Sequence, residues 1–165
     1  MIAALRILAV IVGGTVIWIV AASQVPSHER LPLSGVVVGA VVTQRFGCTS
    51  FDLEPYDPFC PGHHIHTGID LAAPLGTAVH SASAGVARVG FDASGAGLFV
   101  LVTADSHARL FYCHLSAIEV ANGQSVDAGQ VIGALGQTGL ATGPHVHFEV
   151  QVDGTSVDPV EWLAS

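Results

Sequence analysis

The chain of 165 residues contains no lysine, and all five of its basic residues are arginines. Thirteen acidic residues outnumber them, so the formal net charge is -8. No stretch of the sequence concentrates positive charge, and a negatively charged surface repels the phosphates of nucleic acids. We therefore expect no nucleic-acid partner.

Charged residues are also scarce, at 11%, whereas half of the residues are hydrophobic and 19 are glycine. This composition argues against disorder. The sequence has no pattern of an amphipathic helix of normal length. It consists instead of short runs rich in β-branched residues, separated by glycines. These runs predict a mainly β fold, with antiparallel strands of a single domain in a folded sheet or sandwich. The predicted strands cover residues 36–43, 77–82, 85–91, 98–104, 108–114, 130–135 and 145–152.

Residues 1–22 are largely apolar and carry Arg6 as their one charged side chain, over about the length that spans a bilayer. We expect an N-terminal apolar helix here, acting as a membrane anchor or as an export signal. The small residues 21–23 would suit a signal cleavage site, so both alternatives stay open. Arg6 precedes the run, which favours placing the remaining chain outside the cytoplasm. Residues 23–32 then read as a linker, and residues 33–165 as the functional domain.

Cysteine is rare, with three residues in the chain. Cys48 and Cys60 bracket a short irregular loop, and an exported domain would be able to oxidise them to a disulfide. Cys113 would then be unpaired. Its neighbours Phe111 and Leu115 share its face of an alternating stretch, so we expect Cys113 to be a core thiol.

Histidine is abundant, with nine residues, and it is the commonest transition-metal ligand. In the stretch His66-Thr67-Gly68-Ile69-Asp70, an imidazole and a carboxylate stand four residues apart around a glycine. The glycine would let the backbone approach a bound ion closely. Alone, this pattern is weak evidence for a metal site.

Two further histidine clusters lie in predicted strands. Strict alternation over residues 145–152 places His145, His147, Glu149 and Gln151 on one face and four apolar residues on the other. In the stretch around Tyr112-Cys113-His114-Leu115, alternation would place His114 on the same face as Leu110 and Tyr112. Each cluster alone is also compatible with structural histidines.

The three clusters together follow the pattern H-x-G-x-D, then Y-x-H-L, then G-x-x-T-G-x-H-x-H-F-E-V. This pattern resembles the lysostaphin-type peptidoglycan endopeptidases, the LytM-like zinc metallopeptidases. The similarity extends over about residues 33–159. The resemblance implies one Zn²⁺ ion held by His66, Asp70 and His147, with His114 and His145 as catalytic histidines and a peptidoglycan peptide as substrate.

The implied ligand set agrees with zinc chemistry. Two nitrogens and one oxygen leave the fourth tetrahedral position free, which distinguishes a catalytic zinc site from a closed structural one. We expect one of His145 and His114 to accept a proton from water and the other to stabilise the developing oxyanion; the division of roles stays open.

The remaining polar residues have weaker assignments. We expect His63 and His64 to be solvated loop residues, with contact to the cleft as the alternative. Asp52, Glu54 and Asp57 should form a solvated loop face, or influence which substrate stems are admitted. His28, His80 and His107 have no predicted partners.

Two alternative functions are kept. A catalytically silent relative that regulates another wall hydrolase would share the fold, and a plain adhesive envelope domain would need only the glycine-rich strands. The HExxH signature of helical zinc proteases is absent. We also expect a membrane contact through the N-terminal segment, a location in the cell envelope or outside the cell, and an envelope-spanning assembly as a candidate partner.

Overall fold

The computed structural model describes residues 5–12, 15–22 and 30–165. Strands predominate in the described part of the chain, which confirms the mainly β prediction. From residue 30 onward, the elements in chain order are α1 (Leu33–Val36), β3 (Val41–Gln44), β4 (Gly47–Thr49), β5 (His64–His66), β6 (Ile69–Ala72), β7 (Ala78–His80), β8 (Gly85–Asp92), β9 (Gly97–Thr103), β10 (Ala108–Leu115), β11 (Ala117–Ile118), β12 (Ser125–Val126), β13 (Val131–Ala134), β14 (His145–Val152), β15 (Thr155–Val157) and α2 (Pro159–Ala164).

The larger sheet has the strand order β12-β8-β9-β10-β14-β6-β3, with β15 paired to β14. All of its neighbouring strands are antiparallel, as predicted. Strand β14 shows why alternation was a reliable signal, because Val146, Phe148 and Val150 are fully buried while the residues between them are partly exposed. One face of β14 therefore builds the core, and the other is available for a site.

A second sheet of three strands, in the order β11-β13-β7, shares one hydrophobic core with the larger sheet. Tyr112 of β10 packs against Phe148 of β14, with ring centroids 5.1 Å apart. The Tyr112 hydroxyl also accepts a hydrogen bond of 2.7 Å from the backbone N–H of Ala82, just beyond β7. This bond ties the two sheets together inside the core, and burial raises the pKa of Tyr112, so the hydroxyl stays protonated.

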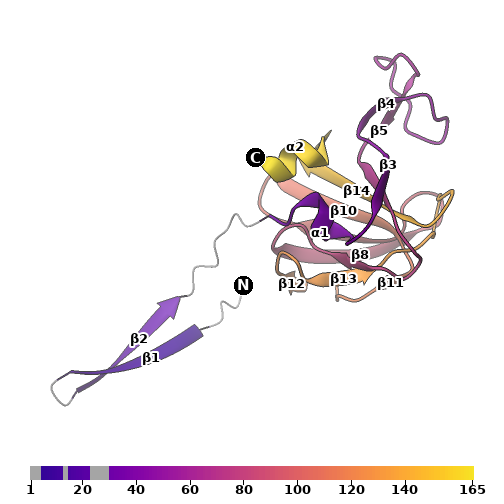
Figure 1. Ribbon diagram of the computed structural model, residues 1–165. Helices are drawn as coiled ribbons and strands as arrows, with labels where there is room; N and C mark the ends of the chain where they lie inside the picture. Colours follow the sequence, from indigo (N-terminus) through magenta and orange to yellow (C-terminus); the bar gives the residue numbers. More distant parts are fainter. Residues whose placement is uncertain (1–4, 13–14, 23–29) are drawn as a thin grey trace.

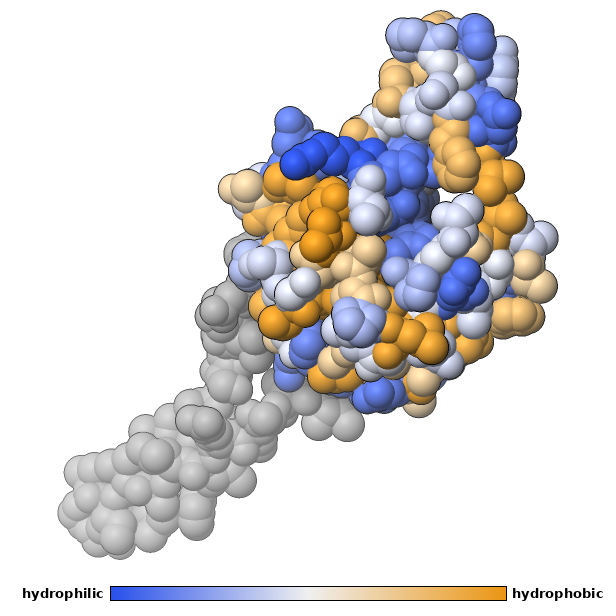
Figure 2. Space-filling model, turned by 45° about the vertical axis from the view of Figure 1, so that its right-hand side comes forward, coloured by the Kyte–Doolittle hydropathy of each residue, from blue (hydrophilic) through white to orange (hydrophobic). Residues whose placement is uncertain are grey.

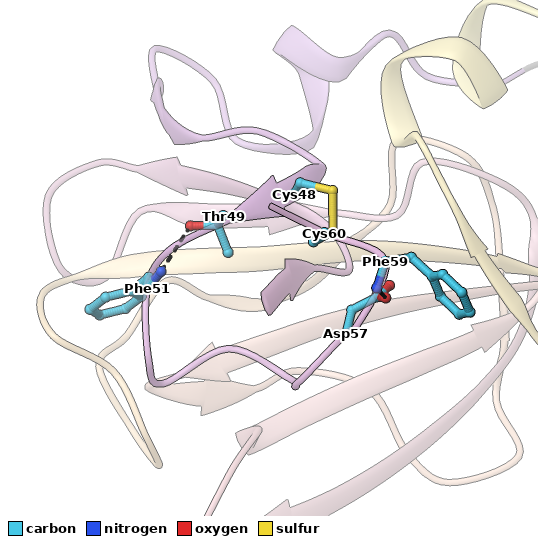
Figure 3. Close-up of a disulfide and its surroundings, with 6 residues drawn as sticks. All are labelled: Cys48, Thr49, Phe51, Asp57, Phe59 and Cys60. Carbon is cyan, nitrogen blue, oxygen red and sulfur yellow. Dashed lines mark hydrogen bonds between the residues drawn. A yellow bond between two sulfur atoms is a disulfide. The ribbon is translucent and has the colours of Figure 1, made fainter. Parts of the chain in front are cut away.

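Strands β4 and β5 form a separate antiparallel pair that projects from the body of the domain beside β3 (Figure 1). The chain between them is the Cys48–Cys60 loop, residues 48–60, closed by a disulfide with a Cα–Cα distance of 5.2 Å (Figure 3). Within the loop, the Thr49 hydroxyl accepts a hydrogen bond from the backbone N–H of Phe51. The disulfide that the sequence allowed between Cys48 and Cys60 is thus present.

The predicted strand over residues 36–43 is only partly correct. The turn of helix α1 occupies residues 33–36, and β3 begins at Val41. Val36 and Val37 are both buried, which a half-exposed strand does not allow for consecutive residues. Gly39 then adopts a positive φ of 77° and turns the chain into β3.

The structure does not show the N-terminal apolar helix that was expected. Within residues 1–22, the described parts are two antiparallel strands, β1 (Leu5–Val12) and β2 (Thr15–Ala22), and the remaining residues lie outside the description. The segment is rich in valine and isoleucine, which favour strands over helices. Among the described residues, no helix has the length and apolar character needed to cross a membrane.

We predict that Tyr112→Phe lowers the free energy of unfolding by about 1–3 kcal/mol, because the buried N–H of Ala82 loses its acceptor. Urea denaturation measures the change. Tyr56→Phe is the matched control, since Tyr56 is 70% exposed, and it should shift stability by less than about 0.5 kcal/mol. Equal effects of the two substitutions would contradict the role given to the Tyr112 hydroxyl.

Candidate metal centre and cleft

His66, Asp70 and His147 bring their potential ligand atoms to one point on the larger sheet. His66 Nε2 lies 3.0 Å from His147 Nδ1, and Asp70 Oδ1 lies 3.1 Å from each of these nitrogens. The ligand atoms all lie within 4.8 Å of one another. The structure thus gathers the three residues that the sequence predicted as ligands into a group able to hold one ion.

Three strands supply these side chains. Asp70 on β6 is directly opposite His147 on β14 in the antiparallel register. Ile69 and Leu71, on either side of Asp70, are buried in the core, so the carboxylate projects from the opposite face. His66 is the last residue of β5, and its side chain is only 1% exposed.

Gly68 is required by the close approach of β14, through both the backbone oxygen of Phe148 and the imidazole of His147. A Cβ atom at residue 68 would lie 2.9 Å from Nε2 and Cε1 of that ring and 2.5 Å from the backbone oxygen of Phe148. Real Cβ atoms do not approach neighbours this closely. The glycine in the first motif therefore makes room for the third ligand candidate, rather than for the ion itself.

In each histidine of the group, the ring nitrogen that faces away from the centre has a partner that fixes the orientation of the ring. His66 Nδ1 donates to the backbone carbonyl of Arg45 at 2.9 Å, so its Nε2 lone pair faces the centre. His147 is turned the other way, with Nε2 facing Glu149 Oε2 at 3.6 Å and Nδ1 facing the centre. Outer partners of this kind hold metal-binding imidazoles in one tautomer and orientation.

The electrostatics favour a cation at this point. Burial opposes the charge on Asp70, but the contacts of its carboxylate with His147 and His66 outweigh burial and hold the pKa of Asp70 well below its usual range. Burial likewise opposes ionisation of Glu149, yet its pKa falls to about 2 through contacts with His147 and with Ser156, Gln151 and Thr67. Burial lowers the pKa of His147, but the two carboxylates outweigh it and raise that pKa to about 9.

His145 and His114 lie beside the three-residue group, with ring centroids 4.7 Å apart. His145 Nδ1 donates to the carbonyl of Gly143 at 2.8 Å, and His114 Nδ1 donates to the carbonyl of Thr138 at 2.9 Å. In the neutral form of each ring, Nε2 is therefore the nitrogen without a proton, and that of His145 is 3.8 Å from Asp70 Oδ1. Burial lowers the pKa of His114, aided by the neighbouring imidazoles and opposed by the bond to Thr138.

Simple alternation placed His114 on the wrong face. The expectation grouped it with Leu110 and Tyr112, which are core residues. Instead the pairing of β10 with β9 shifts register between Tyr112 and Leu115, and His114 adopts a positive φ of 63°. This strained backbone turns the imidazole towards His145, and such strain is typical of functional positions.

Cys113 is buried, as expected, but it does not belong to the main core. It pairs with His147 across β10 and β14 and lines the cleft, whereas Leu115 lies in the core. Burial raises the pKa of the Cys113 thiol to about 12, with smaller contributions from Glu149 and Asp70. The thiol therefore stays protonated beneath the site.

A cleft of about 460 Å³ runs over this group of residues. Figure 2 shows hydrophilic residues gathered in a hollow below the projecting part of the molecule. Its walls come from the Cys48–Cys60 loop, from the β8–β9 connection and from the segment before β14. The lining includes His114, His145, His147, Asp70, Glu149, Gln44, Phe51, Leu53, Glu54, Ser94, Leu140 and Thr142.

Among the described residues, His63, His64, His80 and His107 do not line this cleft. His64 Nδ1 donates to the carbonyl of Glu54 at 2.7 Å, and the ring of His63 stacks on Tyr56. His107 pairs with Asp153 at 2.6 Å on the surface. His80, on β7, has a buried Nδ1 without a partner in the described part of the chain. His28 lies outside the described residues.

Sequence reasoning did not assign the groups that orient the rings. The carbonyls of Arg45, Thr138 and Gly143 act through the backbone, so their residue types gave no signal. Glu149 did carry a signal, because alternation placed it on the face of His147.

The fold and the site define a β-sheet protein with a candidate single-ion centre and two further imidazoles at a cleft, the arrangement of a hydrolase.

Comparison with known proteins identifies the family. The model of peptidase family M23 matches residues 64–159, which is more than half of the chain. The chain belongs to this family. This confirms the resemblance to lysostaphin-type and LytM-like peptidases.

One relative is peptidoglycan DD-endopeptidase ShyA of Vibrio cholerae, which is 36% identical over 113 residues, covering 68% of this chain and 26% of the relative. The chain spans about a quarter or less of the length of the curated relatives it matches first.

Two solved structures share the fold. The catalytic domain of the antimicrobial peptidase lysostaphin from Staphylococcus simulans superposes with a TM-score of 0.63 at 32% identity, covering 76% of this chain and 93% of that domain. A zinc-containing peptidase from Vibrio cholerae gives a TM-score of 0.66 at 30% identity, covering 79% of this chain and 40% of that protein.

We predict that Gly68→Ala weakens the affinity for a zinc ion by about 10- to 100-fold, because the new methyl group displaces the ring of His147. Competition with a chromogenic chelator measures the affinity, and circular dichroism checks that the fold persists. Gly143→Ala is the matched control, since a Cβ there meets nothing within 4 Å. An unchanged zinc affinity for the folded Gly68→Ala variant would show that this glycine does not shape the centre.

Proposed function

We propose that this protein is a zinc-dependent endopeptidase that hydrolyses peptide bonds in the stems or cross-bridges of peptidoglycan. One Zn²⁺ ion would be held by His66 Nε2, Asp70 Oδ1 and His147 Nδ1. The observation that carries the proposal is the convergence of these three atoms beside two oriented imidazoles at an open cleft.

The residues present suit zinc. Imidazole nitrogens and a carboxylate are its common ligands, and three protein ligands leave one position for a reactant. The ionised carboxylates of Asp70 and Glu149 provide the negative charge that a divalent cation requires. When bound, zinc acts as a Lewis acid towards a carbonyl and lowers the pKa of water.

His145 and His114 would accept and donate protons during hydrolysis. Because each Nδ1–H is committed to a backbone carbonyl, Nε2 is the atom that exchanges a proton with the reactants. In the neutral form, this nitrogen accepts the proton of the attacking water; in the protonated form, it donates a hydrogen bond to the oxyanion. The lowered pKa of His114 favours its neutral form near pH 7.

The substrate proposal draws on the relatives. ShyA is named as a peptidoglycan DD-endopeptidase and lysostaphin as an antimicrobial peptidase. The complete set of His66, Asp70, His114, His145 and His147 supports an active enzyme over a silent relative.

We further propose that the protein works in the cell envelope or outside the cell. The Cys48–Cys60 disulfide supports an oxidising compartment. In this proposal residues 33–165 are the catalytic domain, residues 23–32 the linker and residues 1–22 the membrane anchor or export segment. Fractionation of cells expressing the full chain tests the attachment, because an anchored protein stays with the membrane until detergent is added.

Two classes of variant should separate metal binding from catalysis. His66→Ala, Asp70→Ala and His147→Ala should lose both zinc and hydrolysis. His114→Ala and His145→Ala should keep zinc while hydrolysis falls by about 100- to 10,000-fold, since they remove proton transfer alone. Atomic emission measures the zinc content, and mass spectrometry of fragments released from muropeptides of several cross-link types measures hydrolysis and identifies the bond.

His107→Ala serves as the control, because this histidine is 67% exposed and pairs only with Asp153. Protein purified without chelator that contains almost no zinc, or a His147→Ala variant that still hydrolyses peptidoglycan, would overturn the proposal. A zinc-loaded protein that cleaves none of the muropeptides would instead support the silent regulator of another wall hydrolase.

A further inference from the structure

We infer that Glu54 is a specificity-determining residue whose carboxylate binds a side-chain amine of the peptide substrate, beside the bond to be cleaved. The inference rests on the proposed peptidase function and narrows its substrate class to peptides with a primary amine near the scissile bond. It arises from an ionisable side chain in the cleft that the proposed chemistry does not use.

Glu54 reaches the cleft from the Cys48–Cys60 loop. Its side chain is only 16% exposed, and it lines the cleft together with Phe51 and Leu53. Its Oε1 lies 3.9 Å from His66 Nε2, one of the proposed zinc ligands. The carboxylate is therefore next to the centre and on the wall that a bound peptide would contact.

The position of Glu54 is fixed before any substrate binds. Its backbone N–H donates to the carbonyl of Phe51 at 3.0 Å, and its own carbonyl accepts from His64 Nδ1 at 2.7 Å. The Gln44 amide donates to Oε1 at 3.0 Å, and the disulfide joins the two ends of the loop (Figure 3). A preorganised carboxylate of this kind gives selectivity at little entropic cost.

Within the described residues, Glu54 forms no ion pair with an arginine or lysine, and its one ion-pair neighbour is His66, a proposed zinc ligand, at 3.9 Å. The chain has no lysine, and none of the ion pairs found there involves an arginine. The other cleft carboxylates are committed, Asp70 to two imidazoles and Glu149 to His147 and three polar side chains. Because a largely buried carboxylate gains from a cation that donates hydrogen bonds to it, an ammonium group is the complementary ligand.

Geometry separates this role from metal ligation. Glu54 is not part of the three-residue group His66, Asp70 and His147, whose ligand atoms lie within 4.8 Å of one another. The half-exposed Phe51 and Leu53 beside it offer an apolar wall for the methylene stem of a long amine side chain. The cleft thus presents both parts of a binding position for such a side chain.

The test compares two substrates that differ only at the amine. Full-length zinc-loaded protein is assayed with a cross-linked stem peptide that carries a free side-chain amine and with the same peptide acetylated at that amine. We expect the wild type to prefer the free amine by about tenfold or more in kcat/KM, as for a charged hydrogen bond. Glu54→Gln, which keeps the shape and removes the charge, should bring the ratio close to one.

Asp52→Asn is the matched control. It removes the same charge from the same loop, but its side chain is 95% exposed and does not line the cleft. It should keep the wild-type ratio. Thermal melting and a thiol assay confirm that both variants are folded and disulfide-bonded.

A second measurement does not depend on hydrolysis. Titration calorimetry of chelator-treated protein with uncleavable versions of the two peptides should show the same preference, and Glu54→Gln should remove it. If the wild type binds with this preference yet cleaves nothing, the proposed function fails and the role of Glu54 stands.

Three outcomes would overturn the inference. Equal binding and cleavage of both peptides by the wild type would show that no amine is recognised. An equal rise in hydrolysis of both peptides in Glu54→Gln would show that Glu54 competes at the metal. If Asp52→Asn lost as much of the preference as Glu54→Gln, the preference would come from the overall negative charge of the loop and not from a contact with Glu54.

Discussion

The antiparallel register of β6 and β14 is the constraint on which the rest of the site depends. It sets Asp70 directly opposite His147 and leaves Ile69, Leu71 and Phe148 in the core. A slip of either strand by one residue would carry its polar side chain into the core and its apolar side chains into the cleft. The hydrophobic effect that builds the core therefore also positions the candidate metal centre.

Around this register, the protein orients each imidazole with a group that only accepts hydrogen bonds. Backbone carbonyls hold the Nδ1–H of His66, His114 and His145, whereas a carboxylate faces Nε2 of His147. Because Nε2 of His147 faces Glu149, this ring presents Nδ1 to the centre, whereas His66 presents Nε2. The carboxylates stay ionised in a sheltered place because the imidazoles and neighbouring polar groups stabilise their charge. Orientation and charge thus come from one network, and the Cys48–Cys60 loop places Glu54 on the cleft wall beside it.

Sequence reasoning succeeded where the backbone is regular. Alternation predicted that His145, His147 and Glu149 share one face of a strand, and β14 confirms it. It failed where the backbone departs from regularity: the shifted register at His114 reversed the expected face, and Gly39 separates α1 from β3. A period of two describes only an uninterrupted strand. Over residues 1–22 length and hydropathy predicted a helix, but β-branched residues favour the strands that the structure describes.

By itself, the sequence determined the residue types of the centre and their order along the chain. It also determined the mainly β fold and the family, because short motifs and the alternation of apolar residues are local properties. Only the tertiary structure decided which atoms meet: the nitrogen that each imidazole presents, the need for Gly68 and the approach of Glu54 to His66. These contacts join strands and loops that are distant in sequence. They follow from the packing of the core, which no local pattern records.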